Sequence, residues 1–396
     1  MTNRKVLICG AGIAGPCLAF WLLRYGFEPV LIERAPAPRT GGYIIDFWGL
    51  GFEVAEKMGL LPALQREGYR IDEVRMVDAH GRRIGGFNAR AFQSVVGDRY
   101  LSILRSDLAR LIFNALGGQV RTLFNDTVTQ IEQTPYGVNV SFSTAPPERF
   151  DLLIGAGGLH SPVRRIAFGA SEWFEHYLGY YVASFSVAGY PHRDTNAYVT
   201  YTLPGLQVSR YSLRDDRTVF MLAFASDAHL PLGPHARGAQ KDILYKTYRA
   251  AGWECYGILR ALEGCEDLYF APVSQIRMPS WQHGRVALIG DACFCPSLLA
   301  GQGSALAMAA AYILAGELAK ADGNHRAAFH AYERLLQPLM AKKQQAAQQF
   351  AGAFVPRTDL GILVRNSVTR MMTFPLVARL FMGRLLSDPL ALPSYS

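Results

Sequence analysis

The sequence predicts an α/β protein in which a parallel-sheet domain is interrupted by an inserted antiparallel β-sheet domain and followed by a C-terminal helical segment. Apolar residues 6–9 stop at a glycine, residues 13–25 carry helical periodicity, and residues 29–33 form a second apolar run. This strand–helix–strand order is typical of a βαβ unit. Residues 181–225 instead alternate in short stretches around turns, which predicts antiparallel strands. Helical patterns dominate from residue 326 onward.

The remaining elements are predicted from the same patterns along the chain. A helix is expected over residues 106–116, with Ser106 as its N-cap. Further strands are predicted at residues 73–78, 128–131, 137–142, 152–156 and 285–289, and further helices at residues 241–262, 304–319, 326–349 and 360–386. These elements indicate a first domain from residues 1–72, 101–176 and 275–324, an inserted domain from residues 73–100 and 177–274, and C-terminal helices over residues 325–396.

Composition excludes several classes of protein. Half of the 396 residues are hydrophobic and only 18% are charged, so the chain is not disordered. The net charge of +8 is modest for this length, and no basic run or basic-aromatic stripe indicates nucleic-acid binding. No apolar run is long enough to cross a membrane, and neither the histidines nor the six sparse cysteines show metal-ligand spacing. We therefore expect a cytoplasmic monomer without a metal, a membrane span or a nucleic-acid partner.

A glycine-rich turn follows the first predicted strand and opens the first predicted helix. Gly10 suits the tight turn, Gly12 lets the backbone approach a pyrophosphate, and Gly15 lets the helix pack closely on the strand. Glu33 ends the next strand, where a carboxylate can accept hydrogen bonds from ribose hydroxyls. The expected dinucleotide contacts are Gly10, Gly12, Ile13, Ala14, Gly15, Glu33 and Arg34. The alternative is a glycine turn of an ordinary α/β protein.

A second glycine-rich stretch favours FAD over NAD as that dinucleotide. The predicted strand at residues 285–289 runs into Gly290 and Asp291, and a carboxylate at a strand end can bind polyol hydroxyls. An Ala-rich helix follows, and its positive N-terminus would face a reduced flavin. The residues expected to contact the flavin here are Asp291, Pro296, Gly301, Gln302, Gly303 and Ser304. A bare strand–turn–helix remains the alternative.

These motifs, in this order, resemble those of the class A single-component FAD-dependent aromatic hydroxylases, the p-hydroxybenzoate hydroxylase type. The middle family element, D-G-x-x-S-x-V-R, is present here from Gly157 to Arg164, with Gly157 in place of the usual Asp and Gly158 retained. Cys293 replaces the usual His after Gly-Asp-Ala, and Arg105 matches an arginine that touches the flavin. A helix-start salt bridge is the other interpretation of Arg105.

The resemblance implies a Rossmann-like FAD-binding domain, an inserted substrate domain and a specific chemistry. FAD would be bound non-covalently, NADPH or NADH would bind transiently as the reductant, and O₂ would form a flavin C4a-hydroperoxide that hydroxylates the substrate. The sequence shows no nucleophile–base–acid constellation and no second dinucleotide motif. No residue is therefore assigned a catalytic role, because the chemistry resides on the flavin.

Within that family, the chain is most similar to the tetracycline-inactivating monooxygenases, the tetracycline destructases. The cues include Gly41-Gly42 with Asp46, and a C-terminal helix at residues 360–386 that would cap the site. This likeness implies a polycyclic aromatic or enolic substrate, and Phe47, Trp48 and Arg210 are candidate contacts, although packing or solvation explains each equally well. An aromatic polyketide hydroxylase, a flavin reductase or dehydrogenase, and a non-enzymatic FAD-binding partner protein remain alternatives.

Overall fold

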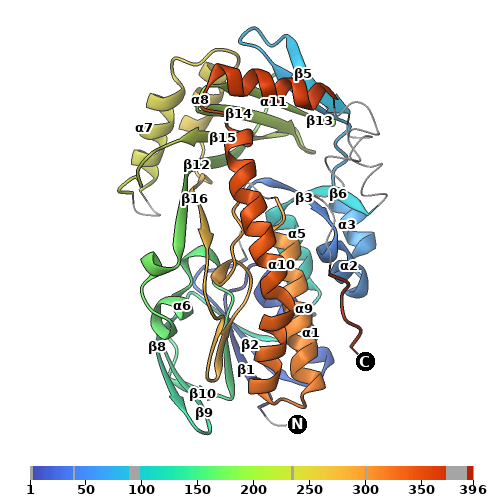
Figure 1. Ribbon diagram of the computed structural model, residues 1–396, viewed down its shortest axis with the longest axis vertical. Coiled ribbons are helices and arrows are strands. Elements are labelled where there is room, and N and C mark those ends of the chain that lie inside the picture. Colours follow the sequence, from blue (N-terminus) through green and yellow to red (C-terminus); the bar gives the residue numbers. More distant parts are fainter. Residues whose placement is uncertain are drawn as a thin grey trace.

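The computed structural model describes residues 3–38, 41–88, 99–232, 236–298, 301–371 and 390–395. Two sheet-based units lie one above the other along the long axis of the molecule, and one long helix runs across both (Figure 1). The lower unit in this view contains a parallel sheet, and the upper unit contains a larger, mainly antiparallel sheet. This arrangement confirms the predicted α/β class with an inserted sheet and a helical C-terminal segment.

The lower unit is built on a six-stranded sheet in the order β17-β18-β11-β1-β2-β7. Its strands are β1 (Lys5–Cys9), β2 (Glu28–Glu33), β7 (Arg121–Phe124), β11 (Leu152–Gly155), β17 (Gln282–His283) and β18 (Val286–Leu288). All neighbours pair in parallel except the edge strand β17. Strands from distant parts of the chain therefore lie side by side, so the glycine turns that follow β1, β11 and β18 meet at one sheet edge.

Helices cover this parallel sheet, and the most buried of them is α9 (Gly303–Lys320). Its alanines leave room for close packing against α1 (Ala14–Arg24), α2 (Leu50–Lys57) and α10 (His325–Phe354). The other helices of this unit are α3 (Leu61–Glu67), α5 (Arg105–Asn114) and α6 (Pro162–Ala167). A small three-stranded sheet joins β8 (Val128–Thr134), β9 (Gly137–Phe142) and β10 (Glu148–Phe150). The N-cap prediction for Ser106 is wrong, because α5 begins at Arg105 after Leu104 and has no side-chain cap.

The upper unit contains a seven-stranded sheet in the order β16-β12-β15-β14-β13-β4-β5. Its strands are β4 (Glu73–Val77), β5 (Arg83–Asn88), β12 (Glu175–Ala188), β13 (Ala197–Leu203), β14 (Leu206–Ser212), β15 (Arg217–Ala225) and β16 (Tyr269–Ile276). The sheet is not wholly antiparallel, since β13 pairs in parallel with β4. That pairing is possible because β4 arrives from a separate stretch of chain rather than through a hairpin.

The two faces of the seven-stranded sheet have different neighbours. Helices α7 (Arg237–Tyr248) and α8 (Cys255–Glu263) cover the outer face with one apolar cluster. The inner face looks toward the ribbon of β3 (Ile44–Trp48) and β6 (Tyr100–Leu104), which belongs to the lower unit. We use "inner face" below for this side of the sheet, because it lies above the glycine turns.

The helical C-terminal segment joins the two units. Helix α10 runs along both, and α11 (Asp359–Met371) lies across the upper sheet (Figure 1). Arg365 attaches α11 to the inner face, because its Nη1 donates to Gln207 Oε1 at 2.9 Å and its Nη2 donates to Thr202 Oγ1 at 3.0 Å. Residues 372–386 of the predicted capping helix lie outside the described residues. Among the described helices, none is long and apolar enough to cross a membrane.

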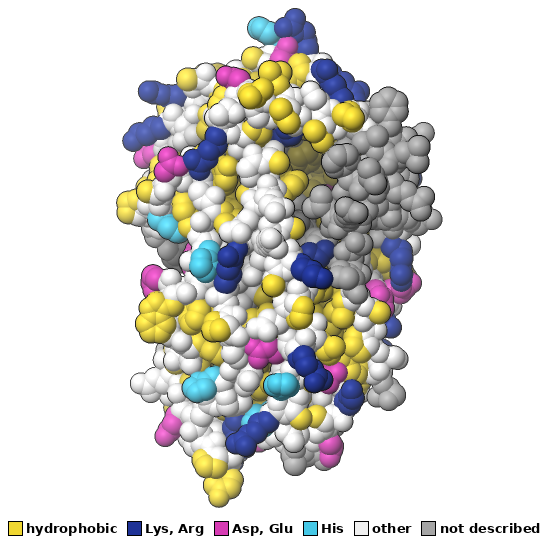
Figure 2. All heavy atoms as spheres, in the orientation of Figure 1, with side chains coloured by type: hydrophobic (Ala, Val, Ile, Leu, Met, Phe, Trp, Pro, Cys, Tyr) yellow, Lys and Arg dark blue, Asp and Glu magenta, His cyan; other side chains and the backbone are white. Residues whose placement is uncertain are grey.

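The surface drawn in Figure 2 has no single basic patch. Lys and Arg side chains are dispersed among acidic and apolar ones over the described part of this face. Nucleic-acid binding requires basic side chains gathered along a track. The described part of this face shows no such track.

Candidate cofactor and substrate site

The turn between β1 and α1 has a shape that needs glycine at two positions and leaves open space at a third. Gly10 has φ +122°, and a Cβ there would lie 2.5 Å from the carbonyl oxygen of Ala156. A Cβ at Gly15 would overlap the carbonyl oxygen of Gly10. A Cβ at Gly12, in contrast, would meet no atom within 4 Å. Packing within the protein therefore explains Gly10 and Gly15, whereas Gly12 borders space in which a phosphate could reach the backbone.

The carboxylate of Glu33 lies beside this turn. Its Oε2 accepts a hydrogen bond from the Ala11 N–H at 2.9 Å, and its Oε1 accepts one from the Ala35 N–H at 2.9 Å. Each carboxylate oxygen can accept a further hydrogen bond, and the side chain is only half-buried. Glu33 is therefore held where it could bind ribose hydroxyls, while the next residue, Arg34, is exposed.

A second part of the site gathers charge around Asp291, in the short 3₁₀ helix η3 (Gly290–Ala292). A Cβ at Gly303 would lie 3.5 Å from Asp291 Oδ1, so the carboxylate lies at the N-terminus of α9. Burial raises the pKa of the Asp291 carboxyl, and the positive charge of Arg105 opposes that rise. Arg105 also lies near two phenols, those of Tyr43 and Tyr269, whose ring centroids are 5.3 Å apart. The site thus combines a carboxylate, a guanidinium and two aromatic rings.

Arg164 links the loops that follow β11 and β18. It is fully buried, and its guanidinium donates to the carbonyls of Ala292 at 3.0 Å and Leu159 at 2.5 Å. Leu159 lies in the 3₁₀ helix η1 (Gly158–His160), where Gly158 has φ +71° and no atom near its Cβ position. The sequence marks Arg164 only as part of a motif, and its bridging role becomes visible once the two strands pair. Arg164 therefore fastens the loop after β11 to the loop after β18. We call these two the flavin loops, because they would surround a flavin.

The remaining predicted cofactor residues line the approach to α9. The carbonyl of Pro296 accepts a hydrogen bond from Gln275 Nε2 at 2.8 Å, and Gln302 is the buried N-cap residue of α9. Cys293 and Cys295 are buried, and burial raises the pKa of each thiol well above its ordinary value. Such thiols are unreactive. Within the described ranges, no cluster of His, Cys, Asp or Glu could hold a metal.

A row of polar and flexible side chains crosses the inner face above this site. Four side chains on adjacent strands stand opposite one another: Ser184 on β12, Met221 on β15, Ser209 on β14 and Thr200 on β13. Thr200 Oγ1 and Ser209 Oγ are 3.0 Å apart. Tyr198 is the neighbour on the same face, and a small cavity of about 10 Å³ separates this wall from Tyr43 and Ile44. Ser184 and Ser209 have no exposed surface, so a substrate placed between the inner face and the flavin loops would first meet the half-buried Met221 and Tyr198.

Arg210 is not where the sequence predicts it. It points to the outer face, where Nε donates to Glu254 Oε2 at 2.9 Å and Nη2 donates to Asp194 Oδ2 at 2.7 Å. The side chain is 5% exposed and stacks over Trp253. Strand alternation sends Ser209 inward and Arg210 outward, so its guanidinium is committed to two carboxylates and cannot reach a ligand on the inner face.

The two aromatic candidates on β3 also differ from each other. Phe47 has no exposed surface and packs in the core, 6.1 Å from the ring of Phe52. A residue so enclosed supports the fold and makes no ligand contact in this conformation. Trp48 is buried beside the flavin loop, and its ring lies 3.9 Å from the Cβ position of Gly301. Of this pair, only Trp48 is adjacent to the predicted cofactor residues.

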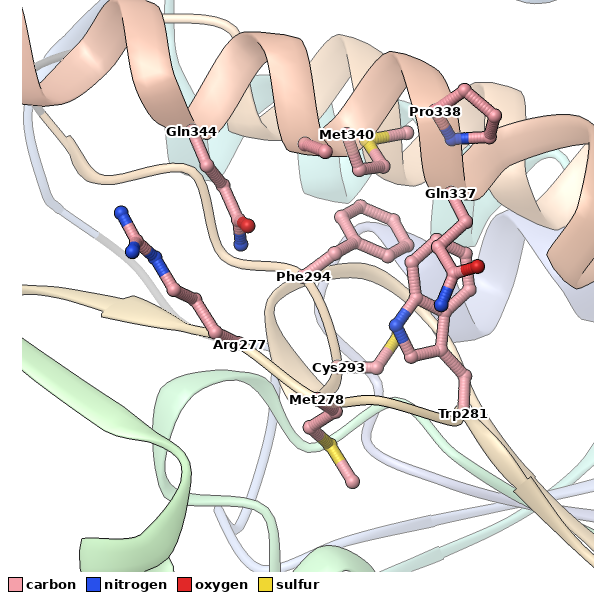
Figure 3. A pocket seen from close by; sticks show the side chains of 10 residues that line it. Arg277, Met278, Trp281, Cys293, Phe294, Gln337, Pro338, Met340 and Gln344 are labelled. Carbon is pink, nitrogen blue, oxygen red and sulfur yellow. The ribbon is translucent and has the colours of Figure 1, made fainter.

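A separate pocket of about 370 Å³ lies between α10 and the loop that precedes β18. Figure 3 shows Trp281, Phe294 and Met340 around it, with Gln337 on α10 and Arg277 on the opposite wall. The Arg277 guanidinium donates to Gln275 Oε1 at 2.6 Å, so it is already engaged. None of the predicted cofactor residues lines this pocket. It is therefore distinct from the site around Asp291.

Comparisons with known proteins show which family and which solved structures the chain resembles. A family model described as "FAD binding domain" matches residues 3–347. A protein of Legionella longbeachae named flavin-dependent monooxygenase is 35% identical over 396 residues, covering 99% of this chain and 98% of its own. The crystal structure of tetracycline destructase Tet(51) is 31% identical, has a TM-score of 0.84 and covers both chains completely. Klebsiella pneumoniae HpxO, complexed with FAD and uric acid, shares the fold at 21% identity and a TM-score of 0.80.

Proposed function

Because the chain belongs to the FAD binding domain family and is an FAD-dependent monooxygenase, we propose that it uses NADPH or NADH and O₂ to hydroxylate a polycyclic aromatic or enolic substrate. Tetracycline is the substrate we propose to test first. The observation that carries this proposal is the pairing of a glycine-rich cradle whose residues fit FAD with the inner face, where the half-buried Met221 and Tyr198 stand. Similarity to tetracycline destructases at 30–31% identity over the whole chain supports the choice of substrate.

The residues of the cradle fit FAD. Gly12 would let the pyrophosphate reach the backbone, Glu33 would bind the adenosine ribose, and Asp291 would bind the ribityl chain near the N-terminus of α9. Bound FAD would activate O₂ for transfer of one oxygen atom. Arg164 keeps the two loops around the flavin in register, and Arg365 holds α11 against the inner face.

A flat, polar ligand suits the wall opposite the cradle. Large ring systems bury most of their surface against apolar and aromatic walls, and a few polar groups set their orientation. The half-buried Met221 and Tyr198 offer such surface, and the buried hydroxyls of Ser184, Thr200 and Ser209 lie in the same wall behind them. The nicotinamide reductant would bind transiently, since the sequence has no second dinucleotide motif.

The test is turnover of a substrate panel by the FAD-loaded protein. We expect tetracycline to stimulate NADPH oxidation and to yield a product about 16 mass units heavier, the mass of one oxygen atom. Fused-ring polyketides without the tetracycline substituents form the second group, and monocyclic phenols form the third. The proposal is wrong if a monocyclic phenol stimulates NADPH oxidation while every polycyclic compound leaves it at the basal rate. NADPH oxidation without an oxygenated product would indicate a flavin reductase instead.

A further inference from the structure

Asp46 lies on β3 at the border between the flavin loops and the inner face. It stands directly opposite Ser102 on β6, and it shares a strand face with Ile44, two residues earlier. Ile44 lines the small cavity together with Tyr198 and Ser209. The Asp46 side chain therefore points toward the space where we place the substrate, and not into the core that holds its neighbours Ile45 and Phe47.

The hydrogen bonds of Asp46 leave one of its oxygens available. Tyr100 donates its hydroxyl to Asp46 Oδ1 at 2.7 Å, and Ser102 donates its hydroxyl to the same oxygen at 2.6 Å. Among the described residues, no group donates to Oδ2. Two hydroxyls therefore hold the carboxyl group in place while its second oxygen can meet a ligand.

Burial, rather than the groups that face Asp46, favours proton uptake by it. Three phenols face it, Tyr100 on β6, Tyr198 on β13 and Tyr211 on β14; burial raises the pKa of each, and the negative charge of Asp46 adds to that rise. Burial raises the pKa of Asp46 itself, and the hydrogen bonds from Ser102 and Tyr100 oppose that rise. A carboxylate whose pKa is raised is a stronger base than an exposed one.

We propose that Asp46 is a catalytic residue that accepts the proton of an enol or phenol hydroxyl of the substrate through Oδ2, while Tyr100 and Ser102 position it through Oδ1. This inference rests on the proposed function, because it concerns the same substrate. A hydrogen-bond acceptor on β3, rather than a cation such as Arg210, would then bind the hydroxyl of the substrate.

The step balances within the site. The substrate O–H bond breaks, an O–H bond forms at Asp46 Oδ2, and the electron pair stays on the substrate oxygen as an enolate or phenolate. That negative charge is delocalised onto the ring carbon that is to be hydroxylated. Deprotonation thus makes the substrate a better nucleophile, and the proton is held in the site until product release.

The variant Asp46→Asn isolates this role. An asparagine keeps an Oδ1 acceptor for Tyr100 and Ser102, so a merely structural role predicts little change in any property. The proposal predicts a kcat at neutral pH about 10²–10⁴-fold lower, with melting temperature and FAD affinity unchanged. It also predicts that the variant regains activity as pH rises toward the pKa of the free substrate hydroxyl, whereas the wild type does not need this rise.

A second readout does not depend on turnover. Without NADPH, wild-type protein should bind the best substrate of the panel with the absorption spectrum of its ionised form, at a pH where the free compound is neutral. Asp46→Asn should bind the neutral form. The control is Asp126→Asn, which alters a buried carboxylate in the loop between β7 and β8, away from the ribbon of β3 and β6, where it accepts a hydrogen bond from the Ser143 hydroxyl at 2.6 Å. It should retain the wild-type bound spectrum and pH profile.

The outcomes separate this inference from the proposed function. If wild-type protein oxygenates no polycyclic compound, the proposed function fails before Asp46 is tested. If wild-type protein turns one over and Asp46→Asn matches its kcat, its pH profile and its bound spectrum, the inference about Asp46 is wrong and the proposed function stands. A loss of kcat without recovery at high pH would also contradict a proton-accepting role.

Discussion

Substituting alanine at two glycines of the same turn should separate cofactor binding from folding. A methyl group at Gly12 meets no protein atom within 4 Å, and Gly12 does not have a positive φ. Gly12→Ala should therefore fold with an unchanged melting temperature. The methyl group would fill the space where a phosphate approaches the backbone. Losing one charge-assisted hydrogen bond of about 1.5–3 kcal/mol would weaken FAD binding roughly 10- to 150-fold.

Gly15→Ala is the matched comparison. Its methyl group would overlap the carbonyl oxygen of Gly10 and lie 3.3 Å from the Ile8 side chain, so α1 must move away from β1. Overpacking of this kind costs about 1–3 kcal/mol of folding stability. Apoprotein should be titrated with FAD by quenching of flavin fluorescence, and each variant melted without FAD. Wild-type FAD affinity in Gly12→Ala, or an equal loss of stability in both variants, would refute the reasoning.

Three other substitutions test separate parts of the structure. Asp291→Ala should weaken FAD binding by about 1.5–3 kcal/mol in the same titration, because it removes a charged acceptor; an unchanged affinity would count against its role. Arg210→Met should lower the free energy of unfolding by about 3–5 kcal/mol in a urea titration, since it leaves Glu254 and Asp194 without their buried cation, yet substrate KM should not change. Burial, with the charges of Arg285 and Arg326, lowers the pKa of His325 from 6.5 to about 4. As the pH falls, this histidine therefore binds its proton at a higher pH in the unfolded chain than in the folded protein. Stability should fall between pH 6.5 and about 4, and His325→Gln should reduce that fall in melting scans.

The cofactor cradle could be predicted from sequence because its signals are local. A strand, a glycine turn, a helix and an acid at the next strand end stand within one short stretch, and packing within the protein requires glycine at Gly10 and Gly15. The Asp291 turn is readable for the same reason. Arg164 is a different case, because its two carbonyl partners belong to separate loops that come together only when β11 pairs with β18.

The substrate wall depends on information that a linear pattern does not carry. Consecutive residues on β14 point to opposite faces, and Ser209 and Arg210 are both buried, so polarity alone does not show which faces the flavin loops. The charge of Arg210 suggests a ligand contact until Glu254 and Asp194 are seen beside it. Asp46 is visible in sequence only as part of a motif, and its position becomes meaningful once β6 brings Tyr100 and Ser102 against it.

The central claim, that this flavoprotein transfers oxygen to a polycyclic enol, is tested most directly by isotope labelling. FAD-loaded protein would be incubated with tetracycline and NADPH under isotopically heavy O₂, and the product analysed by mass spectrometry. The account predicts one heavy oxygen atom per product, about 18 mass units above the substrate, and about 16 under ordinary O₂. NADPH consumption that releases only hydrogen peroxide, with tetracycline and fused-ring polyketides recovered unchanged, would contradict it.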